Sequence, residues 1–428
     1  MSQYTADLHI HPRSAHSAQR GDCISELIFW AKRKGIQVLG TGDFIYPDWL
    51  GFMEAHLEQD ECGFLRSKGG DDIRWMLTTE VETVFQNEGR KYQVHLLVTA
   101  PSWEIAWHLA RVLGRAGDLT AGRIPRFQMP ASELLARVLE VCPDSLIIPL
   151  HIWSPWGSLY GSRFGFESFV NCFGDLSPQV LAVETGLSSD PGVCWLVSEL
   201  DGKQIVSFSD AHSPRDIGRE CTIFQGECSY RGVCQALQGS GENSIAGTIE
   251  FFSEIGRDYF NGHRDCGVIK SPVETRLEGK RCPACRDEIT IGALQRGLEI
   301  ADREVKDLGV FQEKGWIHTQ KLRRPPYRKA IPLREIIAST CGIKGKESVI
   351  VDRIYEAALG CGATEYQILL EMSESDLKSF VDPQVSEGIV RVRESRLKVV
   401  PGFDGVYGSI ELFEEKELAD LTQLRLFG

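Results

Sequence analysis

Short apolar runs alternate with amphipathic segments through about the first 255 residues, and this alternation constrains the fold more than any other feature. Segments 24–35 and 132–142 have the apolar spacing of helices that bury one face. The apolar runs have the length of buried strands, and they occupy residues 37–44, 75–85, 92–100, 145–153, 180–186 and 204–212. Repeated strand–helix units predict an α/β fold with a largely parallel sheet or barrel.

Side chains that can bind metal gather at the ends of these runs. Those that follow or end a run are Asp43, Glu80, His151, Asp210 and His212, and His95 interrupts one. The stretch ADLHIHPRSAHS adds His9, His11 and His16 near the start of the chain. In a strand, His9 and His11 lie on the same face because they are two residues apart. Singly, Asp43 or Asp210 could cap a helix and His95 could be a core histidine. Together they favour a metal site at one rim of the sheet.

The ligand types indicate the chemistry. Mixed imidazole and carboxylate ligands suit zinc, manganese or iron. Two such ions can activate a water molecule and stabilise the attacking and leaving oxygens of a phosphoryl displacement, so no protein base is required. The predicted reaction class is phosphoester hydrolysis.

A second metal site is predicted from spacing. His263-x2-Cys266 is followed, after fifteen residues, by Cys282-x2-Cys285, which is typical of a structural zinc site. Unrelated free thiols are the alternative. The other cysteines among the thirteen are expected to be thiols, since the N-terminus has no secretion signal and no apolar run reaches the ~20 residues of a membrane span. We therefore expect a cytoplasmic protein without a membrane partner.

Charge is distributed unevenly along the chain. The net charge is −13, yet residues 318–346 carry eight Lys or Arg and a single acid, Glu335. This basic strip is either a solvated linker or a surface that contacts phosphates. Composition predicts four regions: 1–255 with the metal site, 256–330 with the zinc site, a helical region 331–418, and a tail 419–428.

The metal-ligand motifs resemble the polymerase-and-histidinol-phosphatase (PHP) superfamily of phosphoesterases. The resemblance implies a distorted seven-stranded barrel with two or three metals at its rim. By position, His9, His11, Glu80 and Asp210 would hold one metal, and Glu80 would bridge to a second held by His95 and His151. A third would use His212, Asp43 and His16, but Phe44 stands where the superfamily usually has a histidine. Of these, Asp210, Glu80, His9 and His11 are the expected catalytic set.

Further motifs extend the resemblance along the whole chain to the endonuclease Q family. They are residues 40–44, 151–166, 184–191, 209–214, 262–267, 282–292, 324–338 and 401–410. The family implies hydrolysis of the phosphodiester 5′ to hypoxanthine, xanthine, uracil or an abasic site, and we expect single- or double-stranded DNA as the partner. We expect Zn²⁺ both in the finger and in the PHP-type cluster, with Mg²⁺ or Mn²⁺ supporting activity. Two rivals are a PHP phosphatase acting on a small phosphomonoester and a non-catalytic sensor of damage.

Such an enzyme must extrude the damaged nucleotide into a pocket. The candidates for base or phosphate contacts are Trp153, Ser154, Trp156, Ser158 and Arg163, with Arg323, Arg324, Arg328 and Lys329 from the basic strip. Some of the aromatic rings are instead expected to pack beneath the loop.

The end of the chain, QLRLF, resembles the pentapeptide by which bacterial replication and repair proteins bind the sliding β clamp. The residues concerned are Gln423, Leu424, Leu426 and Phe427. Docking of the tail on its own domain is the alternative. We expect a bacterial, monomeric protein that works near the nucleoid.

Overall fold

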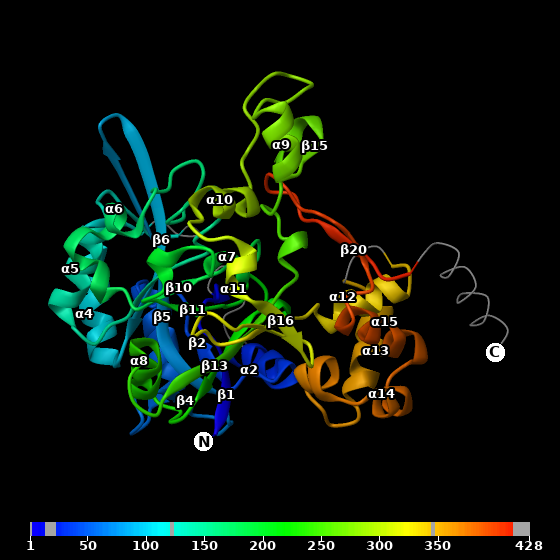
Figure 1. Cartoon of the computed structure of the whole chain (residues 1–428). Helices are drawn as coiled ribbons and strands as arrows, with labels where there is room; N and C mark the ends of the chain where they lie inside the picture. Colours follow the sequence, from blue (N-terminus) through cyan, green and yellow to red (C-terminus); the bar gives the residue numbers. More distant parts are fainter. Residues whose placement is uncertain (1, 13–22, 120–123, 344–346, 414–428) are drawn as a thin grey trace.

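The computed structural model describes residues 2–12, 23–119, 124–343 and 347–413. It is a mixed α/β fold in which a large sheet is covered by helices, a small module projects from one end, and a helical region packs to one side (Figure 1). None of the helices in these ranges is long and apolar enough to cross a membrane.

The large sheet has 14 strands, and its central part is parallel. β1 (Gln3–Asp7), β2 (Val38–Gly40) and β5 (Arg74–Asn87) run in the same direction. The other strands of the predicted α/β region are β6 (Arg90–Ala100), β9 (Ile147–Pro149), β10 (Ala182–Glu184), β11 (Gln204–Val206), β12 (Cys221–Gln225) and β13 (Ser244–Glu250). Each apolar run listed in the sequence therefore contains a strand, as predicted.

The prediction of a largely parallel sheet was wrong, because β6 pairs antiparallel with both β5 and β9, and β12 with both β1 and β13. Glu88 and Gly89, which join β5 to β6, both have positive φ, of 51° and 79°. Two such residues form the tight turn that connects antiparallel strands. The short strands β3 (Leu57–Gln59), β4 (Leu65–Ser67), β7 (Gly117–Asp118) and β8 (Arg126–Phe127) complete this part of the sheet.

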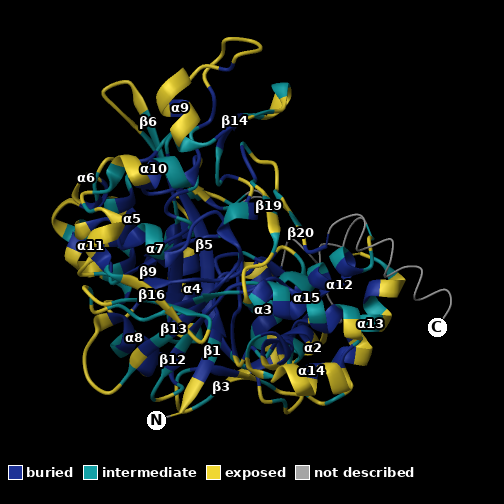
Figure 2. Cartoon of the chain, turned by 45° about the vertical axis from the view of Figure 1, so that its right-hand side comes forward, coloured by how far each residue is buried: buried dark blue, intermediate teal, exposed yellow. Residues whose placement is uncertain are grey.

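Helices cover the sheet and enclose its core. The predicted helices 24–35 and 132–142 are α2 (Cys23–Lys34) and α5 (Ala131–Val141). The others here are α3 (Pro47–His56), α4 (Trp103–Gly114), α6 (Phe169–Phe173), α7 (Pro191–Cys194) and α8 (Tyr230–Gln238). Figure 2 shows the buried interior along the sheet, where large side chains such as Trp49, Trp75 and Phe127 are fully enclosed. This core fixes the strands and turns that carry the predicted ligands. The prediction that Glu80 ends a strand was wrong, because β5 continues through it and pairs with β6 on both sides of it, so Glu80 and His95 both lie within strands.

The projecting module begins with β14 (Asn261–His263), β15 (Val268–Lys270) and α9 (Pro272–Glu278). The chain then returns to the main body through α10 (Ala293–Ile300) and α11 (Val305–Leu308). The strands β16 (Val310–Glu313), β17 (Trp316–Thr319) and β18 (Tyr327–Lys329) extend the large sheet, with β18 beside β13. The predicted region 256–330 is thus divided between the module and the sheet.

The helical region has its own core. Its helices are α12 (Leu333–Thr340), α13 (Val349–Leu359), α14 (Glu374–Phe380) and α15 (Pro383–Arg393). Ile336, Tyr355 and Ile389 are among its fully enclosed side chains. A buried ion pair, Lys34 Nζ to Glu365 Oε2 at 2.9 Å, joins it to α2. Helices were predicted for this region.

A hairpin of β19 (Lys398–Val400) and β20 (Ser409–Glu411) leaves the helical region and extends toward the projecting module (Figure 1). We call residues 401–408 the hairpin tip. Gly402 N donates to Glu254 O at 3.0 Å, and Gly408 N donates to Ile255 O at 2.9 Å. A Cβ at Gly402 would lie 2.1 Å from Gly256 O, so only glycine allows this close approach. The tip is therefore bound tightly to the segment that leads into the module.

Candidate metal centre

Glu80 lies at the centre of the predicted ligands, and its two carboxylate oxygens face different histidines. Oε2 is 2.9 Å from His11 Nε2 and 3.5 Å from His9 Nε2. Oε1 is 2.7 Å from His95 Nδ1 and 3.6 Å from His151 Nε2. This arrangement is that of a carboxylate able to bridge two metal ions.

Asp210 extends the cluster on the side of His11. Its Oδ1 is 3.2 Å from His11 Nε2, 3.6 Å from His9 Nε2 and 3.6 Å from His212 Nδ1. Three sets of ligand atoms each lie within 4.8 Å of one another, namely His9–His11–Glu80, Glu80–His95–His151 and His11–Asp210–His212. The donors are imidazole nitrogens and carboxylate oxygens, so the residues fit the metals predicted from the sequence.

The expected third site is less complete. Asp43 Oδ1 is 4.0 Å from His11 Nδ1, while Phe44 is fully buried in the core. His16 lies outside the part of the chain that the structure describes. Asp43 therefore adjoins the cluster without belonging to one of the three compact sets.

Three ligand residues have left-handed backbone conformations. The φ angles of Asp43, His151 and Asp210 are 55°, 32° and 49°. Such values are uncommon for residues other than glycine, and residues held in this way cluster at functional sites. The three turns at these strand ends therefore orient the side chains into the cluster at a conformational cost.

Opposite charges dominate the electrostatics of the cluster. Burial raises the pKa of Glu80, but the neighbouring His95 and His11 outweigh it and hold this pKa well below its usual range. The pKa of Asp210 is lowered in the same way, because the effect of the neighbouring His9 and His11 outweighs the effect of burial. Burial alone would lower the pKa of His11, yet Glu80 and Asp210 raise it to about 10. Glu80 and Glu82 likewise outweigh burial and raise the pKa of His95 to about 9.

Metal binding is therefore expected to release protons. Below their raised pKa values, His11 and His95 carry protons in the metal-free protein, and a metal must displace both. The affinity for Mn²⁺ should rise with pH, by as much as about 100-fold from pH 7 to pH 8 if both protons leave. Mn²⁺ titrations at several pH values, with a dye that reports released protons, measure this. An affinity independent of pH over this range would contradict it.

A cavity of about 460 Å³ opens above the cluster. Its floor includes Glu80, His95, His151 and Asp210, and its walls include Ser154, Trp156, Arg219, Arg257 and Tyr407. Trp156 and Tyr407 are 44% and 52% exposed, so both rings are accessible from the cavity mouth. Arg219 donates to the carbonyl of Asp210 at 3.0 Å and so connects the wall to a ligand turn. The cavity combines metal ligands, cationic groups and flat apolar rings.

The aromatic stretch after His151 divides between cavity and core. Trp156 and Ser154 line the cavity, as expected of contact residues. Trp153 was predicted wrongly, because its ring is fully buried against Tyr160 and its Nε1 donates to Cys194 Sγ at 3.3 Å. Ser158 was also wrong, since it is fully buried and donates to the carbonyl of Ile152 at 3.1 Å. Arg163 lies over the Trp156 ring, with its guanidinium carbon 5.4 Å from the centroid.

The basic strip is not one phosphate-contacting surface. Arg324 is committed to the protein, since it donates to the carbonyls of Leu200 and Lys203. Arg328 donates to Leu370 O at 2.9 Å, and Lys329 is paired with Asp190 at 3.0 Å and Glu254 at 2.8 Å. These three cations stabilise the contacts between regions of the chain, so their prediction as DNA contacts was wrong. Arg323 is exposed.

The four predicted zinc ligands come together in the projecting module. The ligand atoms of His263, Cys266, Cys282 and Cys285 lie within 4.8 Å of one another, with Cys285 Sγ 3.7 Å from His263 Nδ1. Backbone N–H groups of Cys285 and Ala284 lower the pKa of the Cys282 thiol to about 7, which favours the thiolate that metals bind. The hairpin tip contacts this site, because Arg264 N donates to Asp404 Oδ2 at 2.7 Å.

Two residues of the candidate site were not identified from the sequence. Glu184 ends β10 and contacts the ligand His9, and its position after an apolar run is the same signal that identified the other ligands. Tyr407 reaches the cavity from the hairpin tip, more than 190 residues beyond the last cluster ligand, His212. The sequence feature that could have indicated a close backbone approach there is the glycine-rich stretch 401–408.

Comparisons with known proteins give matches over the full chain. No protein-family model matches it. Two solved structures align with nearly the whole chain. The lesion-specific endonuclease PfuEndoQ from Pyrococcus furiosus is 26% identical, with a TM-score of 0.79 over 99% of both chains. Endonuclease Q in complex with a 27-mer duplex that carries an abasic lesion at the active site is also 26% identical, with a TM-score of 0.82 over 97% of this chain and 98% of that one.

Two uncharacterized proteins are similar in sequence. MJ0043 of Methanocaldococcus jannaschii is 30% identical over 65% of this chain, and the match spans only about a third, 34%, of that relative. YqxK of Bacillus subtilis is 26% identical over 96% of this chain and 100% of its own length.

Proposed function

The chain belongs to the endonuclease Q family, and from this premise we propose that it is a metal-dependent DNA repair endonuclease. The observation that carries the proposal is Glu80, whose two oxygens face two sets of histidines on the floor of a cavity. Metal ions held by these residues would supply an activated water and neutralise charge on the phosphodiester. The alignment of the whole chain with an endonuclease Q that holds abasic DNA supports DNA as the substrate.

We further propose cleavage 5′ to deaminated bases (hypoxanthine, xanthine, uracil) and abasic sites. The extruded nucleotide would enter the cavity, with Trp156 and Tyr407 offering flat surfaces and Arg219 and Arg257 offering positive charge. The strands around the cluster are proposed to form the PHP-type barrel. Of the expected ligands, Asp43, His212 and His16 are assigned to an optional third metal.

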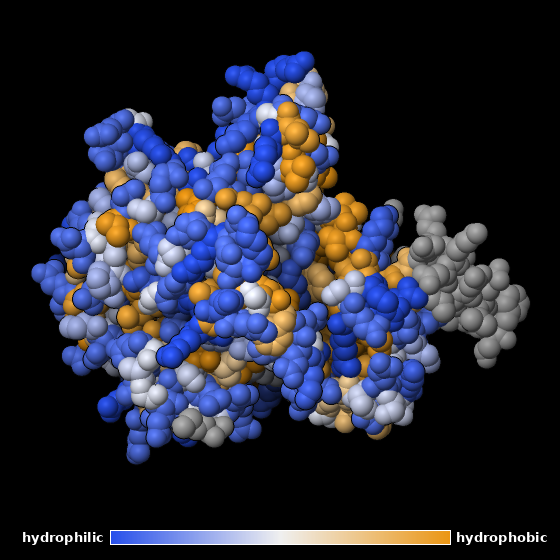
Figure 3. Space-filling model, viewed as in Figure 1, coloured by the Kyte–Doolittle hydropathy of each residue, from blue (hydrophilic) through white to orange (hydrophobic). Residues whose placement is uncertain are grey.

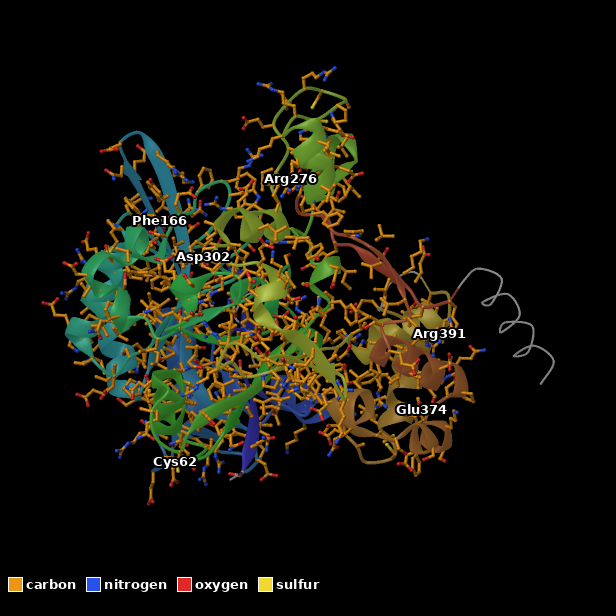
Figure 4. The ribbon with its side chains drawn as sticks, viewed as in Figure 1. Cys62, Phe166, Arg276, Asp302, Glu374 and Arg391 are labelled. Atoms are coloured by element: carbon orange, nitrogen blue, oxygen red, sulfur yellow. The ribbon has the colours of Figure 1, made fainter. Side chains whose placement is uncertain are left out.

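The projecting module and the helical region are proposed to hold the duplex. The module would bind a structural zinc ion through its histidine and three cysteines. Its surface combines Arg276, labelled in Figure 4, with the exposed apolar side chains Val273 and Leu277 on the same helix (Figure 3). Arg323 is the one member of the predicted basic strip that we retain as a phosphate contact.

A cleavage assay tests the proposed function. End-labelled duplexes carry one deoxyinosine, one uracil, one abasic site or no lesion, and are incubated with Mg²⁺ or Mn²⁺ and either the natural protein or Asp210→Ala. We expect one cut 5′ to each lesion, absent from the undamaged duplex and from the variant. Release of phosphate from small monoesters without DNA cleavage would instead identify a phosphatase.

The two tryptophans after His151 should behave differently when replaced by alanine. Trp156→Ala should weaken binding to a duplex that carries one deoxyinosine by about 1–3 kcal/mol, the contribution of one stacked base, and leave the melting temperature unchanged. Trp153→Ala should destabilise the fold by about 3–5 kcal/mol, because the buried ring leaves a cavity. Fluorescence anisotropy and thermal unfolding measure the two effects. Unchanged DNA affinity of Trp156→Ala would remove Trp156 from the substrate pocket.

We also propose that the protein acts as a monomer on chromosomal DNA in the cytoplasm and binds the sliding β clamp. The peptide Gln423–Phe427 lies outside the described ranges, so this proposal rests on sequence. Deleting residues 423–428 should abolish binding to purified clamp in a surface-plasmon experiment and leave lesion cleavage intact. Equal clamp binding by the shortened chain would reject it.

A further inference from the structure

Glu184 contacts two metal-ligand residues that come from different strands. It ends β10, and its side chain is fully buried. Its Oε1 is 2.9 Å from His9 Nδ1, and its Oε2 accepts a hydrogen bond from the backbone N–H of His151 at 2.8 Å. One carboxylate thus joins a residue of the His9–His11–Glu80 set to a residue of the Glu80–His95–His151 set.

The contact with His9 determines which ring nitrogen is available to a metal. A carboxylate oxygen accepts, so Nδ1 must carry the proton that it donates to Glu184. The other nitrogen, Nε2, then faces Glu80 Oε2 at 3.5 Å and Asp210 Oδ1 at 3.6 Å. A buried carboxylate that holds the far nitrogen of a histidine fixes both the tautomer and the direction of the ring.

The contact with His151 stabilises an uncommon backbone conformation. His151 has a φ of 32°, and the adjoining Gly186 approaches so closely that a Cβ there would lie 2.4 Å from the Cβ of His151. In this turn the His151 N–H is satisfied by the Glu184 side chain, while Ile152 N donates to the Glu184 carbonyl at 3.1 Å. The strand end at Glu184 therefore holds the turn that directs His151 toward Glu80.

We propose that Glu184 is a positioning residue for both metal sets: it fixes His9 with Nε2 toward the cluster and holds the strained turn of His151. This proposal rests on the proposed function in one respect, namely that the cluster binds metal. An amide cannot replace the carboxylate, because it has one acceptor oxygen for two N–H donors. In Glu184→Gln, either His9 adopts the wrong tautomer or the His151 N–H loses its acceptor.

The first test measures metal binding without DNA. Metal-free protein is titrated with Mn²⁺, which the cysteine-rich zinc site disfavours, and free Mn²⁺ is followed by electron paramagnetic resonance. Glu184→Gln should bind Mn²⁺ about 10- to 100-fold more weakly than the natural protein. The matched control is Glu250→Gln, which alters another fully buried glutamate whose hydrogen bonds run to Ser207 at 2.5 Å and Thr185 at 3.3 Å. The control should bind Mn²⁺ normally.

A second measurement needs no substitution of Glu184. In Zn²⁺-loaded protein with ¹⁵N-labelled histidine, the signals of His9, assigned by their loss in His9→Gln, should show a proton on Nδ1 and metal on Nε2. Metal on Nδ1 would overturn the proposal, and so would normal Mn²⁺ affinity of a folded Glu184→Gln protein. If Glu184→Gln does not fold, the ¹⁵N result decides. Natural protein that binds Mn²⁺ but cuts no DNA would reject the proposed nuclease and leave the role of Glu184 standing.

Discussion

Replacing Glu80 by glutamine should reduce cleavage of lesion-bearing DNA by at least about 1,000-fold, the largest catalytic effect we expect from a single substitution. Each oxygen of this carboxylate faces a separate set of histidines, at 2.9 Å from His11 and 2.7 Å from His95. Glutamine keeps one oxygen and turns an NH₂ group toward the other set. It also removes the negative charge that would hold two cations close together.

The measurement is single-turnover cleavage of an abasic duplex with saturating Mn²⁺, together with the number of Mn²⁺ ions bound. We expect Glu80→Gln to retain its fold and to bind fewer ions, while Glu250→Gln, an equally buried change, cleaves normally. A Glu80→Gln protein that cuts at more than about a tenth of the natural rate would mean that another residue bridges the metals.

The second large effect concerns the projecting module. Cys285→Ser should remove one equivalent of zinc and unfold residues 261–290, because structural zinc supplies about 10–16 kcal/mol in zinc-finger peptides and this module has little other core. Its helix α9 is largely exposed, with Leu277 80% accessible (Figure 2). When the module unfolds, the affinity for lesion-bearing duplex should also fall, while Mn²⁺ binding at the main cluster should persist.

Hydrogen exchange with mass spectrometry, zinc analysis and anisotropy measure these outcomes. The control is Cys62→Ser, which alters an exposed cysteine in the main body and should change none of them. Slow exchange in the module of a zinc-free Cys285→Ser protein would show that packing alone holds it together.

The candidate metal centre could be predicted from sequence because the signal for each ligand lies in the few residues around it. An acid or histidine directly after an apolar run marks a strand end, and strand ends converge on one rim. The three compact sets hold seven residues, and the sequence offered all seven as candidates. His9 and His11 were identified by their spacing, His95 within an apolar run, and the other four by following or ending a run, although Glu80 in fact lies inside β5. Glu184 carries the same signal, yet the sequence does not distinguish a ligand from the residue that orients a ligand.

The predictions that were wrong depend on contacts between residues that are far apart in the sequence or on the packing of the whole fold. Trp153 and Trp156 are three residues apart, and only the packed fold shows that one ring meets Tyr160 while the other remains 44% exposed. Arg324 and Arg328 appeared available as cations, but carbonyl groups 124 and 42 residues away in the sequence accept their hydrogen bonds. The antiparallel course of β6 had a readable signal in the Glu88–Gly89 turn, which the strand–helix alternation concealed.

The hairpin tip has a consequence for how the protein is made. Tyr407 forms part of the cavity wall, and Gly405 N donates to Asp258 Oδ1 at 3.0 Å on the same side, so residues close to the end of the chain complete a site that begins at His9. During synthesis the N-terminal ligands emerge and fold long before this wall exists. A partly synthesised or C-terminally shortened chain would hold the metal ligands in an open, unfinished cavity. The cavity above the metal ligands is therefore complete only after residues 401–408 have been synthesised and have packed beside Asp258.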